Sequence, residues 1–312
     1  MASRNSFVFY GSADISAKLL RKIIELGFVP KAIITVKPKP SGRGLKVSPS
    51  LISDIAHSHS IPLIEVGSFK DSLIVEKIFG FKTDYALLFA FGKIIPQQLL
   101  ALYEYGILNI HPSLLPHYRG PAPIQTALLD GIKTTGVTLI KLDEMLDHGP
   151  IISQKSLPIE TGDNYQLLEE KVIETAVHIF VNCIDNYLDQ SLAPIDQDHA
   201  RATYTKMITK EDGLIDWSKP ALDIFNSNRA FSQWPGVWST YKGKRLKLIQ
   251  IELITTGIYS AGRVQLQGGR LVVGCGQGAI AIIQLQMEGK KIISANDFLL
   301  GNKEIIGSTL PT

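Results

Sequence analysis

An asparagine and a histidine two positions apart are the residues of this sequence whose types and spacing are best suited to chemistry. Asn109 and His111 end an apolar run, GILNIH, that has the composition of a β-strand. Side chains two positions apart project from the same face of a strand, so this amide and this imidazole lie side by side. Both can donate hydrogen bonds to one oxygen atom, as is needed to stabilise the oxyanion that forms when an amine attacks a carbonyl group.

A carboxylate follows in a turn-rich segment, LDEMLDHGP. Asp147, in this segment, could pair with His111, stabilise the imidazolium form and help to remove a proton from the attacking amine. The residue types alone leave a second interpretation open. A histidine at a strand end can be purely structural, and Asp147 with Gly149 can simply form a turn.

Positive charge is concentrated in one irregular segment, VKPKPSGRGLKVSPS, which contains no acidic residue. Its cations can contact nucleic-acid phosphates if the segment lies beside the reacting residues. From Lys210 onward the chain has 12 Lys and Arg against 8 Asp and Glu, whereas the rest carries a net charge of −1. A polyanionic partner and a solvated basic surface both account for this distribution. The cations of the segment are Lys37, Lys39, Arg43 and Lys46.

The elements that must position these residues alternate between strand-like and helix-like segments. This alternation predicts an α/β fold with a Rossmann-like, doubly wound, mostly parallel sheet. Ligands bind beyond the carboxyl ends of the strands of such a sheet. The loops expected to bind ligands are therefore those after Tyr10, Val36, Phe89, Asn109 and Leu142. The first strand is not followed by GxGxxG, which argues against a dinucleotide cofactor. The expected strands are 6–10, 31–36, 61–66, 84–91, 106–111 and 136–142, and the expected helices are 14–26, 51–58, 96–103 and 164–188, with Asp14 and Asp163 as candidate caps.

A second domain is expected in the last third of the chain. Hydrophobic periodicity is lost over 190–209, which we interpret as a linker. Beyond it, Gly-punctuated runs such as RLVVGCG and GAIAIIQLQ predict a small antiparallel, OB-like β-barrel, entered through a helix near 221–230. The expected organisation is a catalytic domain at 1–189 and a barrel domain at 210–312.

Composition limits the class of protein. The chain has 312 residues, of which 45% are hydrophobic and 20% charged, typical of a globular protein of two domains. No apolar run approaches the roughly 20 residues that span a bilayer, and the N-terminus lacks a signal sequence, so we expect a cytoplasmic protein without a membrane partner. Cys183 and Cys275 lie far apart without a CxxC pattern, so we expect buried thiols, no disulfide and no zinc site.

Taken together, these motifs resemble a known enzyme family. Asn-x-His, Ser-Leu-Leu-Pro and Arg-Gly-x-x-Pro, followed by Asp147, resemble the active-site signature of the 10-formyltetrahydrofolate-dependent formyltransferases. SGRGLKVSPS, FAFGKIIP, GVTLIKLDEMLDHGPI and WPGVWS extend the resemblance to the members that act on methionyl-tRNA, over essentially the full chain. One departure is Gly11-Ser12-Ala13-Asp14, where the family commonly has Thr-Pro before the Asp. This departure leaves the lining of the methionine pocket open.

The resemblance implies an activity, partners and residue roles. The enzyme would transfer a formyl group from 10-formyltetrahydrofolate, its co-substrate, to the α-amino group of methionine on initiator methionyl-tRNA, for translation initiation and without a metal. Asn109, His111 and Asp147 would be catalytic. The implied folate contacts are Ser113, Leu114, Leu115 and Pro116, with the pterin beside Phe89, Phe91, Gly92 and Ile94. The implied tRNA contacts are Lys37, Lys39, Arg43, Lys46, Lys206, Lys210, Lys244 and Arg245.

Other functions are compatible with parts of this pattern. A formyltransferase acting on an amino-sugar nucleotide would share the catalytic residues and can carry a similar C-terminal domain. An enzyme acting on a glycinamide nucleotide is disfavoured by that extra domain, and an inactive folate- or RNA-binding module by the complete set of Asn109, His111 and Asp147. Phe89 can equally be a simple core residue. We expect the protein to act as a monomer.

Overall fold

The computed structural model describes residues 6–38 and 50–311, and the chain forms two compact units. The continuous domain boundaries expected at residues 189 and 209 stay a prediction. Unit 1 comprises Met1–Gly120, Thr134–Pro158 and Glu169–Tyr204, and unit 2 comprises Pro121–Lys133, Ile159–Leu168 and Thr205–Thr312.

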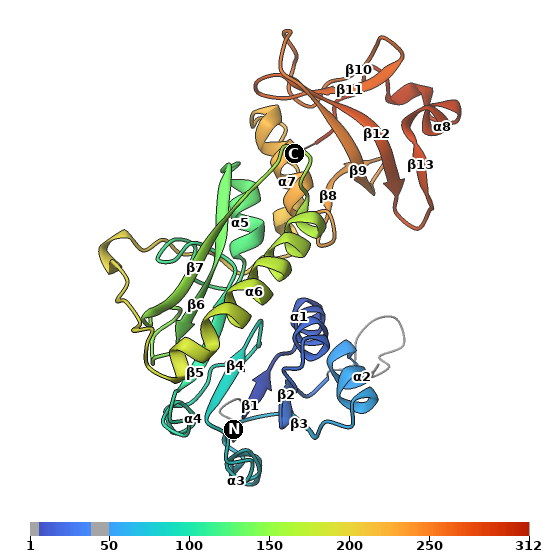
Figure 1. Cartoon of the computed structure of the whole chain (residues 1–312). Helices are drawn as coiled ribbons and strands as arrows, with labels where there is room; N and C mark the ends of the chain where they lie inside the picture. Colours follow the sequence, from blue (N-terminus) through green and yellow to red (C-terminus); the bar gives the residue numbers. More distant parts are fainter. Residues whose placement is uncertain (1–5, 39–49, 312) are drawn as a thin grey trace. The chain divides into compact units, whose positions relative to one another are not determined.

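A seven-stranded sheet with the order β3-β2-β1-β4-β5-β6-β7 forms the centre of unit 1 (Figure 1). The first five strands of this order pair in parallel, whereas β6 is antiparallel to β5, and β7 is antiparallel to β6. The Rossmann-like, mostly parallel sheet is thereby confirmed. Its strands are β1 (Phe7–Tyr10), β2 (Ala32–Val36), β3 (Leu63–Val66), β4 (Tyr85–Leu88), β5 (Ile107–His111), β6 (Thr134–Lys141) and β7 (Ile151–Pro158).

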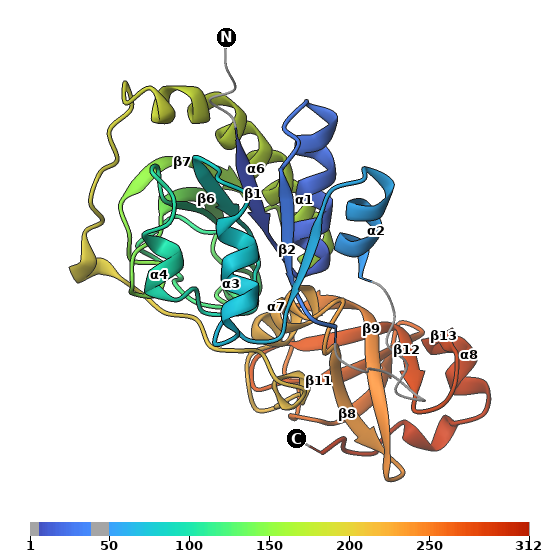
Figure 2. The ribbon, with the colours of Figure 1, turned by 90° about the horizontal axis from the view of Figure 1, so that it is seen from below.

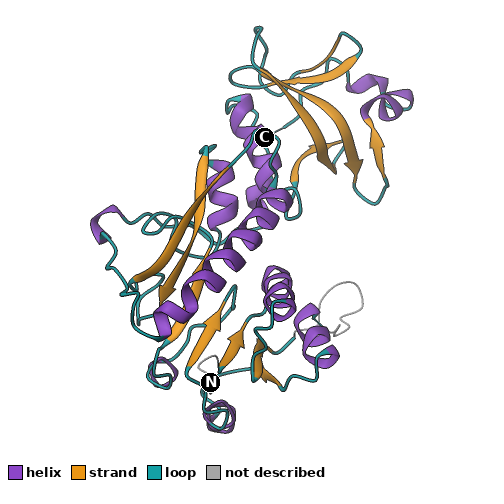
Figure 3. Cartoon of the chain, in the orientation of Figure 1, coloured by secondary structure: helices purple, strands orange, loops and turns teal. Residues whose placement is uncertain are grey.

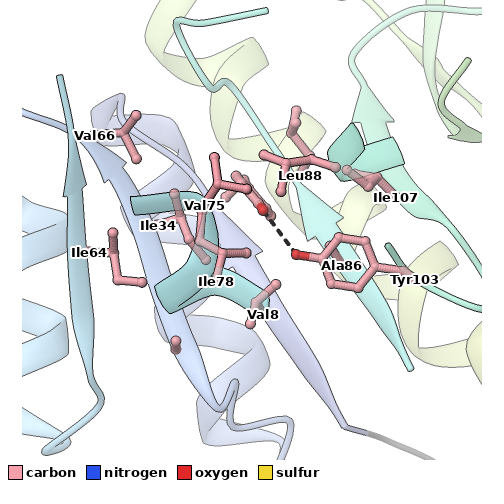
Figure 4. Packing of buried hydrophobic residues seen from close by; sticks show 13 residues of the cluster. Val8, Ile34, Ile64, Val66, Val75, Ile78, Ala86, Leu88, Tyr103 and Ile107 are labelled. Atoms are coloured by element: carbon pink, nitrogen blue, oxygen red, sulfur yellow. Dashed lines mark hydrogen bonds between the residues drawn. The ribbon is translucent and has the colours of Figure 1, made fainter. Parts of the chain in front are cut away.

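Helices cover both faces of this sheet (Figure 2). On one face, Val75 and Ile78 of α3 pack with strand residues such as Val8 and Ile34 in a buried apolar cluster (Figure 4). On the opposite face, the ring centroid of Phe7 lies 6.4 Å from that of Phe180 in α6. The helices of unit 1 are α1 (Asp14–Glu25), α2 (Leu51–Ser58), α3 (Ser72–Phe79), α4 (Gln97–Leu100) and most of α6 (Tyr165–Leu188).

Alternation along the strands builds the cluster in Figure 4. Val8 of β1, Ala86 and Leu88 of β4 and Ile107 of β5 are buried members of it, because every second side chain of a strand points to the same face. The hydroxyl groups of Tyr10 and Tyr103 form a 2.9 Å hydrogen bond within the cluster, so these buried polar atoms satisfy each other.

Unit 2 contains the separate antiparallel sheet expected in the C-terminal region, with the order β10-β11-β12-β9-β8 and with β13 paired to β12 (Figure 3). Within the described part of the chain no ladder joins the outer strands β8 and β10. Trp217 is buried against this sheet, with Nε1 3.4 Å from Ser239 Oγ. The elements are α5 (Pro123–Leu129), α7 (Ala221–Ala230), β8 (Val237–Tyr241), β9 (Lys244–Ile254), β10 (Val264–Gln267), β11 (Arg270–Gly274), β12 (Ala279–Met287), β13 (Ile292–Ser294) and α8 (Ala295–Leu300).

Both expected helix caps are wrong by one residue. The N-cap of α1 is Ala13, without a side-chain bond, and Asp14 lies in the first turn, where its charge favours the helix dipole. At α6 the capping oxygen belongs to Asn164, whose Oδ1 accepts from the Leu167 amide at 3.0 Å. Asp163 instead accepts from the backbone amide of Glu160.

The expected burial of both cysteine thiols is confirmed. Cys183 and Cys275 are free and buried. Burial raises the pKa of Cys183 to about 11 and that of Cys275 to about 12, because the thiolate form is poorly solvated there. Among the described residues, none of the helices has the length and apolar character needed to cross a bilayer.

Candidate active site

The candidate site begins where the apolar face of β5 becomes polar. Ile107 belongs to the core cluster, and Asn109 and His111 follow on the same face of the strand. Both side chains are buried. The register of β5 places Asn109 beside Leu88 of β4, so an imidazole and an amide lie at the carboxyl end of two parallel strands.

The Asp147 carboxylate lies against both of these side chains. Asn109 Nδ2 donates to its Oδ1 at 3.3 Å, and the backbone amide of Gly120 donates to its Oδ2 at 2.8 Å. His111 Nδ1 is 3.5 Å from the same Oδ2. The structure therefore brings together the three residues that the sequence indicated as catalytic.

The route of the chain to Asp147 differs from the expected one. The sequence analysis placed the loop after Leu142 at the carboxyl edge of the sheet, which would require the strand before it to be parallel to β5. This strand, β6, is instead antiparallel to β5 and ends at the opposite edge. The amide of Leu142 accordingly donates to the Ile107 carbonyl, at the start of β5. The following loop then returns along β5 to Asp147, whose φ of 48° lies in the left-handed region.

The hydrogen bonds of His111 define its protonation sites. Its Nε2 lies 2.9 Å from the carbonyl oxygen of Tyr118. A carbonyl can only accept, so Nε2 carries a hydrogen, and Nδ1 is the nitrogen that faces Asp147. The Asn109 amide has two N–H groups and donates one of them to Asp147. The second N–H is the donor that can serve an oxyanion.

The expected folate residues lie on two loops that leave the same edge of the sheet, after the parallel strands β4 and β5. In the second loop, Ser113 Oγ donates to the His117 carbonyl at 2.6 Å, and Leu115 N donates to Thr138 Oγ1 at 3.2 Å. Leu114 packs against Gly136 of β6, where a Cβ would come within 2.3 Å of its side chain. This loop, in which Pro116 is half-buried, is therefore braced on β6.

The first of these loops contains both buried and exposed members of the expected set. Phe89 is 1% exposed and forms part of the core, whereas Ile94 is 91% exposed. Phe91 packs edge-on against Tyr10, with ring centroids 5.4 Å apart. The amide of Gly92 donates to Ser12 Oγ at 3.0 Å, which joins the loop after β4 to the loop after β1. Gly92 and Ile94 also line an open groove with Phe69, Lys70, Lys93 and Pro96.

The expected RNA contacts are only partly within the described residues. Lys39, Arg43 and Lys46 lie outside them, and Lys37 is exposed after β2. In unit 2 the side chains of Lys206, Lys210 and Lys244 are exposed. The guanidinium of Arg245 lies 4.0 Å from the centroid of the Trp238 ring, a cation–π contact.

Gln197 contacts the candidate site but was not singled out by the sequence analysis, which included its partner Arg119 only as part of the Arg-Gly-x-x-Pro motif. Gln197 lies in the segment interpreted as a linker, where no periodicity or motif distinguishes it. Its side-chain amide bonds to the backbone of the Asp147 loop and to Arg119. Within residues 6–38 and 50–311, no group of three or more His, Cys, Asp or Glu side chains is arranged to hold a metal ion.

Comparisons with known proteins give matches over both parts of the chain. A formyl transferase family model matches residues 7–184, and a formyl transferase C-terminal domain model matches residues 207–303. The methionyl-tRNA formyltransferases of Citrifermentans bemidjiense and Geobacter metallireducens are each 36% identical to this chain, over 298 and 297 residues. Each alignment covers 95% of this chain, and they cover 93% and 95% of the two relatives.

Solved structures share the fold at lower identity. The N-formyltransferase of Helicobacter canadensis, in complex with folinic acid and dTDP-3-aminofucose, aligns with a TM-score of 0.67 at 20% identity, over 90% of this chain and 99% of that one. HypX from Aquifex aeolicus, in complex with tetrahydrofolic acid, aligns with a TM-score of 0.65 at 18% identity, over 95% of this chain and 47% of that one.

Proposed function

Because the chain belongs to the formyl transferase family, we propose that it transfers the formyl group of 10-formyltetrahydrofolate to the α-amino group of methionine on initiator methionyl-tRNA. The observation that carries this proposal is the similarity, over 95% of the chain, to relatives named methionyl-tRNA formyltransferase. The enzyme thus takes a folate co-substrate and a tRNA substrate and serves translation initiation. We further propose that it works as a monomer in the cytoplasm.

The proposed reaction forms one C–N bond and breaks another. The deprotonated methionyl nitrogen attacks the formyl carbon, the tetrahedral oxyanion collapses, and the bond from carbon to the folate nitrogen breaks. The amine loses a proton, and the folate nitrogen gains one. Positioning and stabilisation of the oxyanion supply most of the acceleration, with a single well-placed donor worth about 3 kcal/mol.

The site residues fit these steps. The free N–H of Asn109 can donate to the oxyanion, since its other N–H is held by Asp147. The imidazole of His111 lies between the Tyr118 carbonyl and the Asp147 carboxylate, an arrangement that accommodates a proton on each ring nitrogen. We assign proton handling to His111 and Asp147 on this basis.

The proposed folate residues lie on the two loops that follow β4 and β5, and β5 also carries Asn109 and His111. Phe91 and Ile94 follow β4, and Leu114 and Leu115 follow β5, so a flat pterin would be held between two loops of the same sheet edge. Phe89, with 1% exposure, would support this site from the core. Besides Phe89, the residues that we propose for the folate site are Phe91, Gly92, Ile94, Ser113, Leu114, Leu115 and Pro116.

The tRNA contacts that we propose are basic residues that bind phosphates rather than bases. Exposure of the described lysines among them supports this role, because a phosphate contact requires an accessible ammonium group. The Arg245 guanidinium lies over the Trp238 ring, and a guanidinium in such a cation–π contact can still donate N–H groups to a phosphate. The proposed residues are Lys37, Lys39, Arg43, Lys46, Lys206, Lys210, Lys244 and Arg245.

Transfer of labelled formyl from 10-formyltetrahydrofolate to charged initiator tRNA tests the proposal directly. Glycinamide ribonucleotide and an amino-sugar nucleotide serve as alternative acceptors in parallel reactions. We expect formylation of the methionyl-tRNA alone. Preferential transfer to the sugar nucleotide would assign the chain to the other branch of the family, and no transfer to any acceptor would indicate a non-catalytic module.

A further inference from the structure

The chain that follows α6 is held against unit 1 at two points. Ile195 and Ile151, at the start of β7, exchange both backbone hydrogen bonds, with N···O distances of 2.7 and 2.8 Å. Further along, Thr203 donates its backbone N–H to the Pro116 carbonyl at 3.3 Å and accepts from the Arg119 amide at 2.9 Å. This segment is therefore a structural part of unit 1 and not a free connection.

Gln197 lies between these two points and is buried, at 5% exposure. Its Nε2 donates to the carbonyl of Asp147 at 2.9 Å and to that of Gly149 at 2.7 Å. Its Oε1 accepts from Arg119 Nη2 at 2.7 Å. Both N–H groups and the oxygen of the amide are thus engaged, which fixes its orientation.

Arg119, which orients Gln197, is itself linked to the loop that carries Asp147. Arg119 Nη2 also lies 2.9 Å from His199 Nδ1, and the His199 ring stacks on that of His148 at a centroid distance of 3.8 Å. His148 Nδ1 lies 2.6 Å from Asp143 Oδ2. The loop is therefore held at two places: Gln197 bonds to its backbone, and the His199 ring stacks on the side chain of His148.

The Asp147 loop needs such support. Asp147 has a φ of 48°, in the left-handed region that residues other than glycine rarely adopt. In this conformation the carboxylate contacts both Asn109 and His111. Two hydrogen bonds donated to the carbonyls of Asp147 and Gly149 hold the backbone there.

We propose that Gln197, oriented by Arg119, is a positioning residue that holds the Asp147 carboxylate against Asn109 and His111. This inference rests on the proposed function, in which Asp147 handles a proton of the reaction. Gln197 bonds to the backbone carbonyl of Asp147, and both N–H groups and the oxygen of its amide are used within the protein, so it acts through Asp147 and not on a substrate. Its effect must therefore depend on the Asp147 carboxylate.

A double-mutant cycle in the full-length enzyme tests this dependence. Gln197→Glu keeps the size and the contact to Arg119 but replaces two N–H donors by an oxygen that repels the two carbonyls. We expect kcat for formyl transfer to fall about tenfold to a hundredfold, with KM for both substrates changed less than about twofold, since small displacements of a catalytic group affect the chemical step. In the Asp147→Asn background, the same substitution should change kcat by less than about twofold.

Controls separate positioning from folding. Asp198→Asn changes one charge at the exposed neighbouring position and should retain wild-type kcat and KM. If Gln197→Glu unfolds at a lower temperature than the assay, Gln197→Leu replaces it in the same cycle. Equal losses of kcat in both backgrounds, or wild-type kcat for Gln197→Glu, would overturn the positioning role. Absence of transfer by the wild-type enzyme would instead overturn the proposed function itself.

Discussion

At the scale of single residues, hydrogen bonds within the protein fix the two polar side chains of β5 in the candidate site. Asn109 uses one N–H for Asp147 and keeps the other, and His111 uses Nε2 for the Tyr118 carbonyl and presents Nδ1 to Asp147. The protein thereby fixes the orientation of both side chains before any ligand binds. Preorganised donors of this kind are effective because they need no rearrangement as charge develops.

The first prediction concerns the two residues of β5. Asn109→Ala and His111→Ala should each lower kcat by about two to three orders of magnitude, because the first removes the donor proposed for the oxyanion and the second removes the imidazole proposed to handle a proton. Turnover is measured with labelled formyl donor at saturating tRNA, and thermal unfolding shows whether each variant is folded. His57→Ala, at an exposed position of α2, is the matched control and should behave as wild type. Near-wild-type turnover in a folded Asn109 or His111 variant would refute the assignment.

The second prediction concerns the carboxylate. Asp147 accepts from Asn109 through one oxygen and from the Gly120 amide through the other, whereas an asparagine offers one acceptor oxygen. Asp147→Asn should therefore depress kcat and leave the Kd for folate nearly unchanged, since the residue is assigned to proton handling. Equilibrium folate binding and single-turnover rates separate the two effects. Lost folate binding with an unchanged rate per bound complex would make Asp147 a ligand contact instead.

At the scale of secondary-structure elements, strongly patterned segments could be predicted from the sequence. The helix expected at 164–188 is α6 (Tyr165–Leu188), and the strand expected at 106–111 is β5 (Ile107–His111). Both owe their signal to burial, which imposes an apolar pattern. The alternation of the same strand predicted that Asn109 and His111 share one face.

Elements held by hydrogen bonds instead of apolar burial left no such signal. The edge strand β7 is exposed over much of its length and carries Gln154 and Lys155, so its sequence does not alternate clearly. The segment around Gln197 is attached through backbone and amide hydrogen bonds, and its exposed residues follow no period. The antiparallel direction of β6 was missed for a related reason, because the residues of a buried strand do not encode its direction.

The third prediction belongs to the hairpin loop between β6 and β7. An ideal Cβ on Gly149 would lie 1.8 Å from the Lys141 carbonyl oxygen, so Gly149→Ala cannot be accommodated unless the loop moves. We expect a loss of about 1–3 kcal/mol of stability from this overlap and a lower kcat, because the loop carries Asp147. Gly162→Ala, where a Cβ meets nothing within 4 Å, is the control and should retain both properties. Wild-type turnover and stability of Gly149→Ala would contradict a rigid loop.

At the scale of the whole molecule, charge is distributed unevenly along a chain with a net charge of +3. The residues from Lys210 onward carry +4, and the basic segment after β2 adds Lys37, Lys39, Arg43 and Lys46 without an acidic neighbour. The two family models match regions on either side of residues 185–206, and the second region, 207–303, lies almost entirely within this basic last third of the chain. Such a distribution can attract a large polyanion such as tRNA, whereas a nucleotide-sized substrate would not require basic residues in both regions.

The fourth prediction is that the basic segment acts on RNA binding and not on chemistry. Neutralising Arg43 and Lys46 together removes two expected phosphate contacts, each of which contributes roughly 0.9 to the slope of log affinity against log salt for duplex nucleic acid. Affinity for charged tRNA should therefore fall, and fall most at low salt, where screening is weakest. The rate at saturating tRNA should fall less than the affinity, and folate binding should not change.

A control of equal charge makes this result specific. The double variant Lys31→Gln, Lys77→Gln also removes two positive charges, but from exposed positions of unit 1 that lie outside the expected RNA contacts. If the segment contacts phosphates directly, only the Arg43 and Lys46 variant should flatten the dependence of affinity on salt. A direct contact releases counterions from the RNA, whereas a distant charge acts only through a screened electric field. Equal flattening in both variants would show that net charge alone attracts the tRNA. Salt curves superimposable on that of the wild type would instead make the basic segment a solvated connection, and the recognition of tRNA would then depend on the cations from Lys206 onward.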